Sequence, residues 1–266
     1  MDTRAFDFTV IFSVVPALLS YLDVTLAVAF ASIALGSLWG AALSGAKVAG
    51  GKALRGLAHG YTYVMRCTPS IVLLFIVFYG LPVLVRAVSG ENIHDLHRGV
   101  FAVITFALLF GAYISEVFRA AYLAVPRGQY EAAVSIGISP LKAVLHVLLP
   151  QAARIALPNF GNSAINLLKE GSLAYTIGLV DMLGKGNLII AQNFGAYGIE
   201  IYLACILIYW VLVLLLEAAF ARLERALSRG QRQVAANQGK GSWLAALKKI
   251  RFREKAERSD SHGLEY

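Results

Sequence analysis

Long apolar segments dominate the pattern of hydrophobic and polar positions along the chain. Four of them are 16 to 23 residues long and contain no charged side chain, namely Val24–Ala46, Cys67–Val85, Gly99–Ser115 and Ile201–Leu216. Because an α-helix needs about 20 mostly apolar residues to cross a bilayer, this pattern predicts an all-α integral membrane protein. Hydrophobic residues make up 58% of the chain and charged residues only 15%, which argues against a soluble globular enzyme.

The apolar segments predict about five transmembrane helices. We expect them at 24–46, 57–85, 99–121, 152–180 and 199–221. The helix in 152–180 is expected to be broken, because Pro158 and Gly171 interrupt it. A further apolar segment, Phe8–Leu22, is short for a span and contains Pro16. We place it as a lateral helix at the outer interface; if it crosses the membrane, the protein has six spans.

The same pattern divides the chain into three parts. These are an external N-terminal segment, 1–23, a transmembrane domain, 24–225, and a basic tail, 226–266. Four apolar residues of the tail share one helical face beside basic side chains, namely Trp243, Leu244, Leu247 and Ile250. Two interpretations of the tail stay open: an amphipathic helix on anionic membrane lipid, or a solvated tail.

The formal net charge of +8 is distributed unevenly between the connections. The connection that holds Lys47, Lys52 and Arg55, the segment 122–154 and the chain after residue 221 hold 17 basic residues, against 5 in the other connections. Since basic connections stay in the cytoplasm, the N-terminus is predicted outside and the C-terminus inside. The charge therefore indicates orientation in a membrane, and we do not expect binding of nucleic acid.

The chain carries no visible motif for chemistry of its own. Three Gly-Lys pairs lack both the earlier glycine and the following Ser or Thr of a P-loop, and no nucleophile–base pair of the usual kinds is present. His94 and His97 lie in a short external connection, where we expect solvated side chains. Cys67 and Cys205 are lone thiols in apolar segments. We expect no metal site and no enzymatic activity.

Small residues recur at four-residue spacing in the first predicted span, namely Ser32, Gly36, Gly40 and Ser44. Small residues at this spacing allow the backbones of two membrane helices to approach closely. The stripe therefore predicts either packing within the subunit or a seam between two subunits.

The connection 127–151 does not have the composition of a typical loop. Gln129–Ile136 is followed by Gly137, a common helix stop. Ser139–Pro140 then offers a cap and a first-turn proline, which predicts a second helix at Leu141–Leu149. Two short helices across the membrane face indicate either a docking surface for a cytoplasmic partner or a simple interfacial hairpin.

The spacing of five residues in this connection resembles a known motif. Glu131, Ala132 and Ala133 are followed by Gly137 and later by Pro150, and this pattern is similar to the EAA loop of permease subunits in bacterial ABC importers. Other segments are similar to the polar amino acid uptake permeases within that group. They are Arg66–Pro69, Tyr79–Pro82, Tyr113–Arg119, Pro150–Pro158 and Leu168–Leu173.

Two residues depart from the pattern of that group. Cys67 stands where glycine is usual, and Gly171 stands where Thr or Ser is usual. The second departure lies near the region in which such permeases are expected to contact substrate, so it bears on which solute is carried.

The resemblance implies a MetI-like permease fold and a division of labour between chains. The permease would pair with an identical or homologous subunit in the bacterial inner membrane. Two cytoplasmic ATPase subunits, which bind ATP and Mg, would receive the EAA residues, and a periplasmic binding protein would deliver a polar amino acid. This chain would bind no cofactor itself. The alternatives are an autonomous secondary transporter or channel, or an ABC permease for an opine or another small solute.

Polar residues within the predicted spans are candidates for the substrate pathway. Glu116 either faces the pathway or pairs with Arg119 one turn away. Lys169 attracts a substrate carboxylate beside the hydroxyl of Ser172, or it pairs with Glu170 and reaches toward water. The candidate pathway residues are Glu116, Lys169, Ser172, Arg66 and Thr68.

Overall fold

The structure is a computed structural model that describes residues 6–227. The chain divides into two compact units, Met1–Phe220 and Ala221–Tyr266, and the following account concerns the first. The predicted amphipathic helix of the tail lies outside the described residues. Residues 6–227 are mostly helical and contain no strand, so the predicted all-α fold class is confirmed.

The helices follow one another with short connections. In chain order they are α1 (Phe8–Leu19), α2 (Leu22–Ala49), α3 (Lys52–Cys67), α4 (Ser70–Phe75), the π-helical η1 (Ile76–Gly80), α5 (Leu81–Ser89), α6 (Arg98–Leu123), α7 (Arg127–Ser135), α8 (Pro140–Ala143), the π-helical η2 (Val144–Leu148), α9 (Leu149–Gly171), the 3₁₀-helical η3 (Ser172–Ile177) and α10 (Met182–Gln192). The last helix spans Gly198–Leu227.

The described helices fit the expected number of spans. α2, α6, the last helix and the continuous segment Ser70–Ser89 are each long and apolar enough to cross a membrane. The segment Pro140–Ile177 and α10 meet at an angle of 45°, and together they qualify as a fifth, broken span. The sequence predicts a broken fourth segment at 152–180, and the described break, between Ile177 and Met182, lies at the end of that range.

The cause of that break differs in part from the prediction. α9 continues through Pro158 to Gly171, so Pro158 does not interrupt the helix. A proline removes one backbone hydrogen bond, and packed neighbouring helices can compensate for that loss in a membrane protein. At Gly171 the α-helix ends as predicted, and Gly178, with φ +79°, ends η3 before α10 begins.

The predicted span 57–85 is wrong, because two helices share this segment. α3 ends at Cys67, and the apolar span begins only at Ser70. Thr68 between them is extended, with φ −90° and ψ 126°. Pro69 imposes this conformation, since the proline ring disfavours the helical region for the residue before it.

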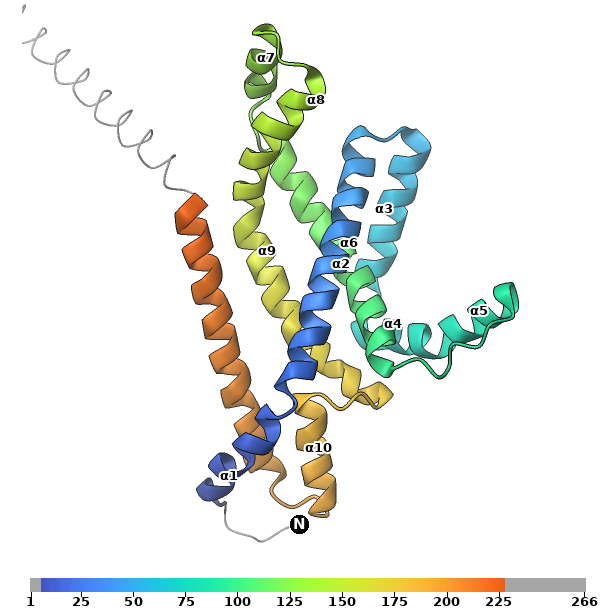
Figure 1. Cartoon of the computed structure of the whole chain (residues 1–266), viewed down its shortest axis with the longest axis vertical. Helices are drawn as coiled ribbons and strands as arrows, with labels where there is room; N and C mark the ends of the chain where they lie inside the picture. The colour runs from blue at the N-terminus through green and yellow to red at the C-terminus, as the bar shows by residue number, and fades with distance from the viewer. Residues whose placement is uncertain (1–5, 228–266) are drawn as a thin grey trace, which may run out of the picture. The chain divides into compact units, whose positions relative to one another are not determined.

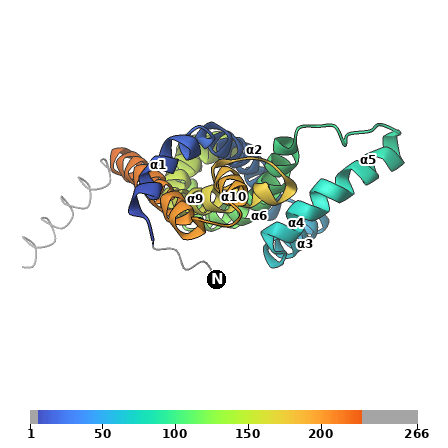
Figure 2. The ribbon, with the colours of Figure 1, turned by 90° about the horizontal axis from the view of Figure 1, so that it is seen from below.

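The two ends of the first unit carry different elements (Figure 1). The turn between α2 and α3 lies at the same end as α7 and α8, whereas α1 and α10 lie at the other end. The view from below shows α2, α6, α9 and α10 gathered together, with α5 extending away from them (Figure 2). α1 is a separate apolar helix of 12 residues, and its lateral placement at the outer interface stays a prediction.

The core lies where α6 meets α2, α4 and α9. Phe101, Phe106 and Ile114 of α6 and Leu74 of α4 are each at most 1% exposed, and they belong to one hydrophobic cluster. Packing on several sides fixes the orientation of α6, and therefore of every polar side chain that it carries.

The small residues of α2 pack against α6 within the subunit. Ser32, Gly36, Gly40 and Ser44 are all buried. A Cβ atom at Gly36 would lie 2.8 Å from the carbonyl oxygen of Ala107, so the two backbones touch. Of the two interpretations of the stripe, the structure supports packing within the subunit.

Replacing Gly40 by valine should destabilise the permease. An added Cβ would lie 3.0 Å from the carbonyl oxygen of Gly111 and would collide with Ile114, and overpacking of this kind costs about 1–3 kcal/mol. Thermal unfolding of the purified protein in detergent measures the loss. Gly45→Val in the same helix is the matched control, because nothing lies within 4 Å of its Cβ position. Equal unfolding temperatures for both variants would contradict this packing.

Candidate coupling segment and substrate cavity

α7 ends in a backbone geometry that depends on glycine. Gly137 has φ +88°, in the left-handed region that residues with a side chain rarely adopt. Its N–H donates to the carbonyl of Val134 at 3.0 Å, and the N–H of Ile138 donates to the carbonyl of Ala133 at 3.2 Å. This pair of bonds is a Schellman motif, so the predicted helix stop at Gly137 is confirmed.

One side of α7 is packed and the other is free. Ala133 is only 6% exposed, and Tyr130 packs against a small cluster formed by Val125, Leu148 and Ala152. Glu131 and Ala132 are exposed. Within the part of the chain that the structure describes, the carboxylate of Glu131 has no ion-pair partner. The carboxylate of Glu131 is therefore exposed on the surface of the subunit.

The second predicted helix of this connection is not a separate element. α8, η2, α9 and η3 form one continuous helical segment from Pro140 to Ile177, so the expected helix at Leu141–Leu149 is the beginning of the next span. Pro140 occupies the first turn as predicted, but the hydroxyl of Ser139 makes no capping bond. The expectation of two separate short helices is wrong, because no residue after Pro140 stops the helix. Pro150 lies in the first turn of α9 and is exposed.

Apolar side chains are exposed around the motif. Arg127 and Lys142 place positive charge in the same segment, and both are exposed. Exposed apolar side chains beside charged residues are typical of a protein–protein contact. The exposed apolar side chains are Val134, Ile136, Leu141, Leu145 and Leu149.

A cavity of about 580 Å³ lies between α6 and α9. Lys169 and Glu170 bring opposite charges to its wall, and neutral hydrogen-bonding groups lie beside them. This combination can bind both charged groups of a small zwitterion, while apolar side chains cover the rest of it. The lining residues are Leu109, Phe110, Tyr113, Ser163, Asn166, Leu167, Lys169 and Glu170.

Three other predicted pathway residues do not line this cavity. The guanidinium carbon of Arg66 lies 5.6 Å from the ring centroid of Tyr113, so Arg66 contacts a residue of the cavity wall without lining the cavity itself. The hydroxyl of Thr68 donates to the carbonyl of Val64 at 2.8 Å, and that of Ser172 donates to the carbonyl of Lys169 at 2.7 Å. Both hydroxyls are engaged locally, and a pathway role for these residues stays a prediction.

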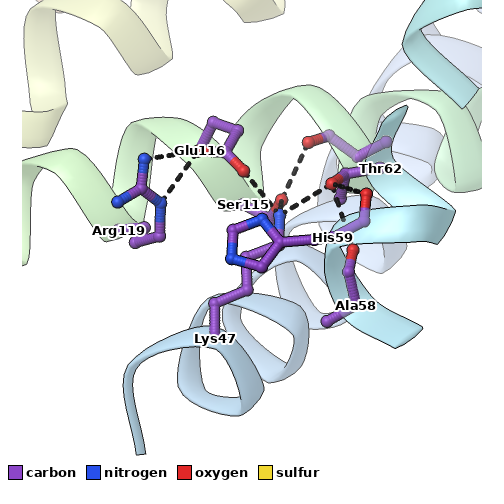
Figure 3. Close-up of polar contacts among 8 residues, drawn as sticks. Lys47, Ala58, His59, Thr62, Ser115, Glu116 and Arg119 are labelled. Atoms are coloured by element: carbon purple, nitrogen blue, oxygen red, sulfur yellow. Dashed lines mark hydrogen bonds and ion pairs between the residues drawn. The ribbon is translucent and has the colours of Figure 1, made fainter. Parts of the chain in front are cut away.

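Glu116 belongs to a different polar cluster (Figure 3), in the last third of α6. Its Oε2 accepts from Arg119, with Nη2 at 2.8 Å and Nε at 2.9 Å, so the pair one turn apart that the sequence suggested is present. Its Oε1 accepts from Lys47 Nζ at 2.7 Å. Both carboxylate oxygens are therefore neutralised within the chain.

Lys47 had been assigned to a connection between two spans, and this assignment is wrong. The residue lies in the last turn of α2, and its side chain is 0% exposed. Because α2 extends to Ala49, the side chain turns inward between helices instead of reaching water. When Lys47 is left out of the count, the connections predicted to be cytoplasmic still hold more basic than acidic residues.

Ser163 and Asn166 were missed by the sequence analysis. Together with Asn159 and Glu170 they recur every three or four residues along α9, which places polar groups on one helical face. This stripe was visible in the sequence. The amide of Asn166 makes no side-chain hydrogen bond that the structure records among residues 6–227, so it is available to a ligand.

Comparison with known proteins gives a consistent result. Residues 32–229 match the family described as binding-protein-dependent transport system inner membrane component. The chain belongs to this family. It is 36% identical over 231 residues to the L-cystine transport system permease protein TcyL of Bacillus subtilis (strain 168), covering 87% of this chain and 95% of the relative. It is also 34% identical to the nopaline transport system permease protein NocQ of Agrobacterium fabrum, covering 78% and 89% of the two chains.

A solved structure of the same kind confirms the fold. The chain resembles a protein in the crystal structure of an amino acid ABC transporter with histidines, with a TM-score of 0.73 and 30% identity. The similarity covers 84% of this chain and 100% of the other. The binding-protein-dependent transport family is a family of membrane permease components, so the predicted permease class and MetI-like fold are confirmed.

Proposed function

We propose that the chain is the permease subunit of an ABC importer that moves a polar amino acid into the cytoplasm. The observation that carries this proposal is the exposed α7. Its Glu131 and Ala132 face outward, its end is fixed by Gly137, and it joins two membrane helices. When a partner protein bound to it closes, a rigid helix placed in this way can transmit that movement to the membrane helices.

The substrate is proposed to bind at the cavity between α6 and α9. An amino acid carries a carboxylate and an ammonium group, and Lys169 and Glu170 supply the opposite charges to both. Charge-assisted hydrogen bonds of this type are stronger than neutral ones. Asn166 and Tyr113 add neutral polar groups, which favours a polar side chain over a purely apolar one.

An opine is the second candidate, because NocQ is a nopaline permease protein by name. Opines are amino acid derivatives and carry the same kinds of charged group. A cavity that binds a zwitterion can therefore bind either solute, and the solute is identified by measuring which compounds the cognate binding protein retains.

An ABC importer of this kind would need three partners for this chain. A cytoplasmic ATPase dimer, with ATP and Mg bound to the ATPase, would dock on α7. A second permease subunit would complete the pathway, and a periplasmic binding protein would deliver the solute. α7, α8 and the α2–α3 turn share one end (Figure 1), and these elements and the first turn of α3 carry the basic residues Lys52, Arg55, Arg127 and Lys142. Such an end belongs in the cytoplasm, which leaves the N-terminus in the periplasm.

Mild purification of the tagged chain from its native membrane should recover a P-loop ATPase. Mass spectrometry of the purified complex identifies what accompanies the chain, and a second permease in the sample would show a heterodimer. A tagged chain that carries Glu131→Lys serves as the matched control and should lose the ATPase. Recovery of the wild-type chain alone, under conditions that preserve a known importer complex, would favour an autonomous transporter.

A further inference from the structure

The ammonium group of Lys47 is enclosed by the permease itself. Its side chain is 0% exposed, and the side chain of its partner Glu116 is 23% exposed. Moving such a charge out of water is costly, and a buried ion pair rarely stabilises a protein more than apolar residues of similar size would. A role in stability alone is therefore a weak explanation for this residue.

Each hydrogen of the ammonium group finds an acceptor, and the acceptors come from two other helices (Figure 3). Nζ of Lys47 donates to Oγ1 of Thr62 in α3 at 3.0 Å. In α6 it donates to Oγ of Ser115 at 2.9 Å and to Oε1 of Glu116 at 2.7 Å. Since an ammonium has three donors, the set is complete. We call Lys47, Thr62, Ser115 and Glu116 the three-helix clasp.

The acceptors are themselves fixed. The hydroxyl of Thr62 donates to the carbonyl of Ala58 at 3.0 Å, and that of Ser115 donates to the carbonyl of Ala112 at 2.8 Å. Arg119 holds the second oxygen of the Glu116 carboxylate. A fully connected network of this kind resists a change in the relative position of its helices.

The clasp lies close in sequence to the exposed α7. α6 ends at Leu123 and α7 begins at Arg127, so only residues 124–126 separate them. Val125 in this connection is 6% exposed and packs with Leu148 and Ala152. A displacement of α7 therefore acts on the end of α6 at Leu123, and through this helix on Glu116.

We propose that Lys47 is a positioning residue that ties α2, α3 and α6 together, so that α2 and α3 move with α7. Without the tie, the end of α6 can move while α2 and α3 lag behind. The inference rests on the proposed import function, because it concerns how the movement of α7 reaches the rest of the membrane domain.

The test compares two variants that each remove one cation from the same carboxylate. Lys47→Met removes the partner on another helix, whereas Arg119→Met removes the partner on the same helix. Each variant is reconstituted into proteoliposomes with the ATPase and the binding protein. Uptake of a mixture of radiolabelled L-amino acids is measured per ATP hydrolysed.

We expect Lys47→Met to lower uptake per ATP by about fivefold or more, with hydrolysis still stimulated by the binding protein. Arg119→Met should stay within about twofold of the wild type, because this partly exposed pair lies within α6 and joins it to no other helix. A normal ratio for Lys47→Met, or an equal loss in both variants, would overturn the proposal.

A paired variant separates movement from stability. Lys47→Met combined with Glu116→Gln leaves no unpaired buried charge, and it should assemble in wild-type yield while uptake per ATP stays low. Failure of the paired variant to assemble, or a restored ratio, would assign the clasp to stability and overturn the proposal. Absence of ATP-driven uptake in the wild type would instead refute the import function.

Discussion

Replacing Glu131 by lysine should reduce ATP-driven uptake by about 100-fold while leaving the permease in the membrane. The carboxylate is exposed and has no ion-pair partner among residues 6–227, so the fold loses nothing when it is replaced. If a basic group on the ATPase receives this carboxylate, a lysine places like charges against each other. Such a juxtaposition costs several kcal/mol at an interface. Uptake into proteoliposomes and co-purification of the ATPase measure the effect together.

Two control variants accompany this prediction. One reverses an acidic charge at another position, and the other removes the charge of Glu131 without reversing it. Glu224→Lys makes the same reversal at an exposed acid of the last helix and should leave uptake near the wild-type level. Glu131→Gln removes the charge without reversing it, so its loss should be intermediate. Wild-type uptake by Glu131→Lys, with the ATPase still bound, would show that Glu131 takes no part in the docking contact.

Features with a local cause could be predicted from the sequence. The positions of α2, α6 and the last helix follow from apolar length, because the bilayer sets that length. Their ends follow less closely, since α2 extends to Ala49 and the last helix to Leu227, beyond the predicted ends at 46 and 221. The end of α7 follows from Gly137, since one residue determines the backbone geometry there. The break at Thr68 also has a local cause in Pro69, but the apolar residues on both sides of it predict one span.

The clasp could not be predicted in this way. Lys47 bonds Thr62, Ser115 and Glu116, which lie 15, 68 and 69 residues away. A lysine near the end of an apolar run is usually a residue of a basic connection, and only the packing of three helices shows that it is buried. The polar face of α9 is a different case, because its spacing was present in the sequence and was overlooked.

Lys169→Met should lower uptake about 10- to 100-fold at a low concentration of substrate-loaded binding protein. Loss of a hydrogen bond to a charged group costs about 1.5–3 kcal/mol, and each 1.4 kcal/mol corresponds to a factor of ten. Since Lys169 lies on the cavity wall and apart from α7, basal ATP hydrolysis should change little. Hydrolysis stimulated by substrate should fall with uptake.

The comparison that decides the role of Lys169 uses another lysine of the same broken span. Lys185 lies in α10, with its Nζ 5.3 Å from the ring centroid of Tyr21, and it is absent from the cavity lining. Lys185→Met therefore removes a positive charge nearby without removing one from the cavity. If Lys169 binds the substrate carboxylate, only its own variant loses substrate-stimulated hydrolysis. If both variants lose uptake and basal hydrolysis equally, the lysine serves the structure of the span, and the carboxylate binds elsewhere.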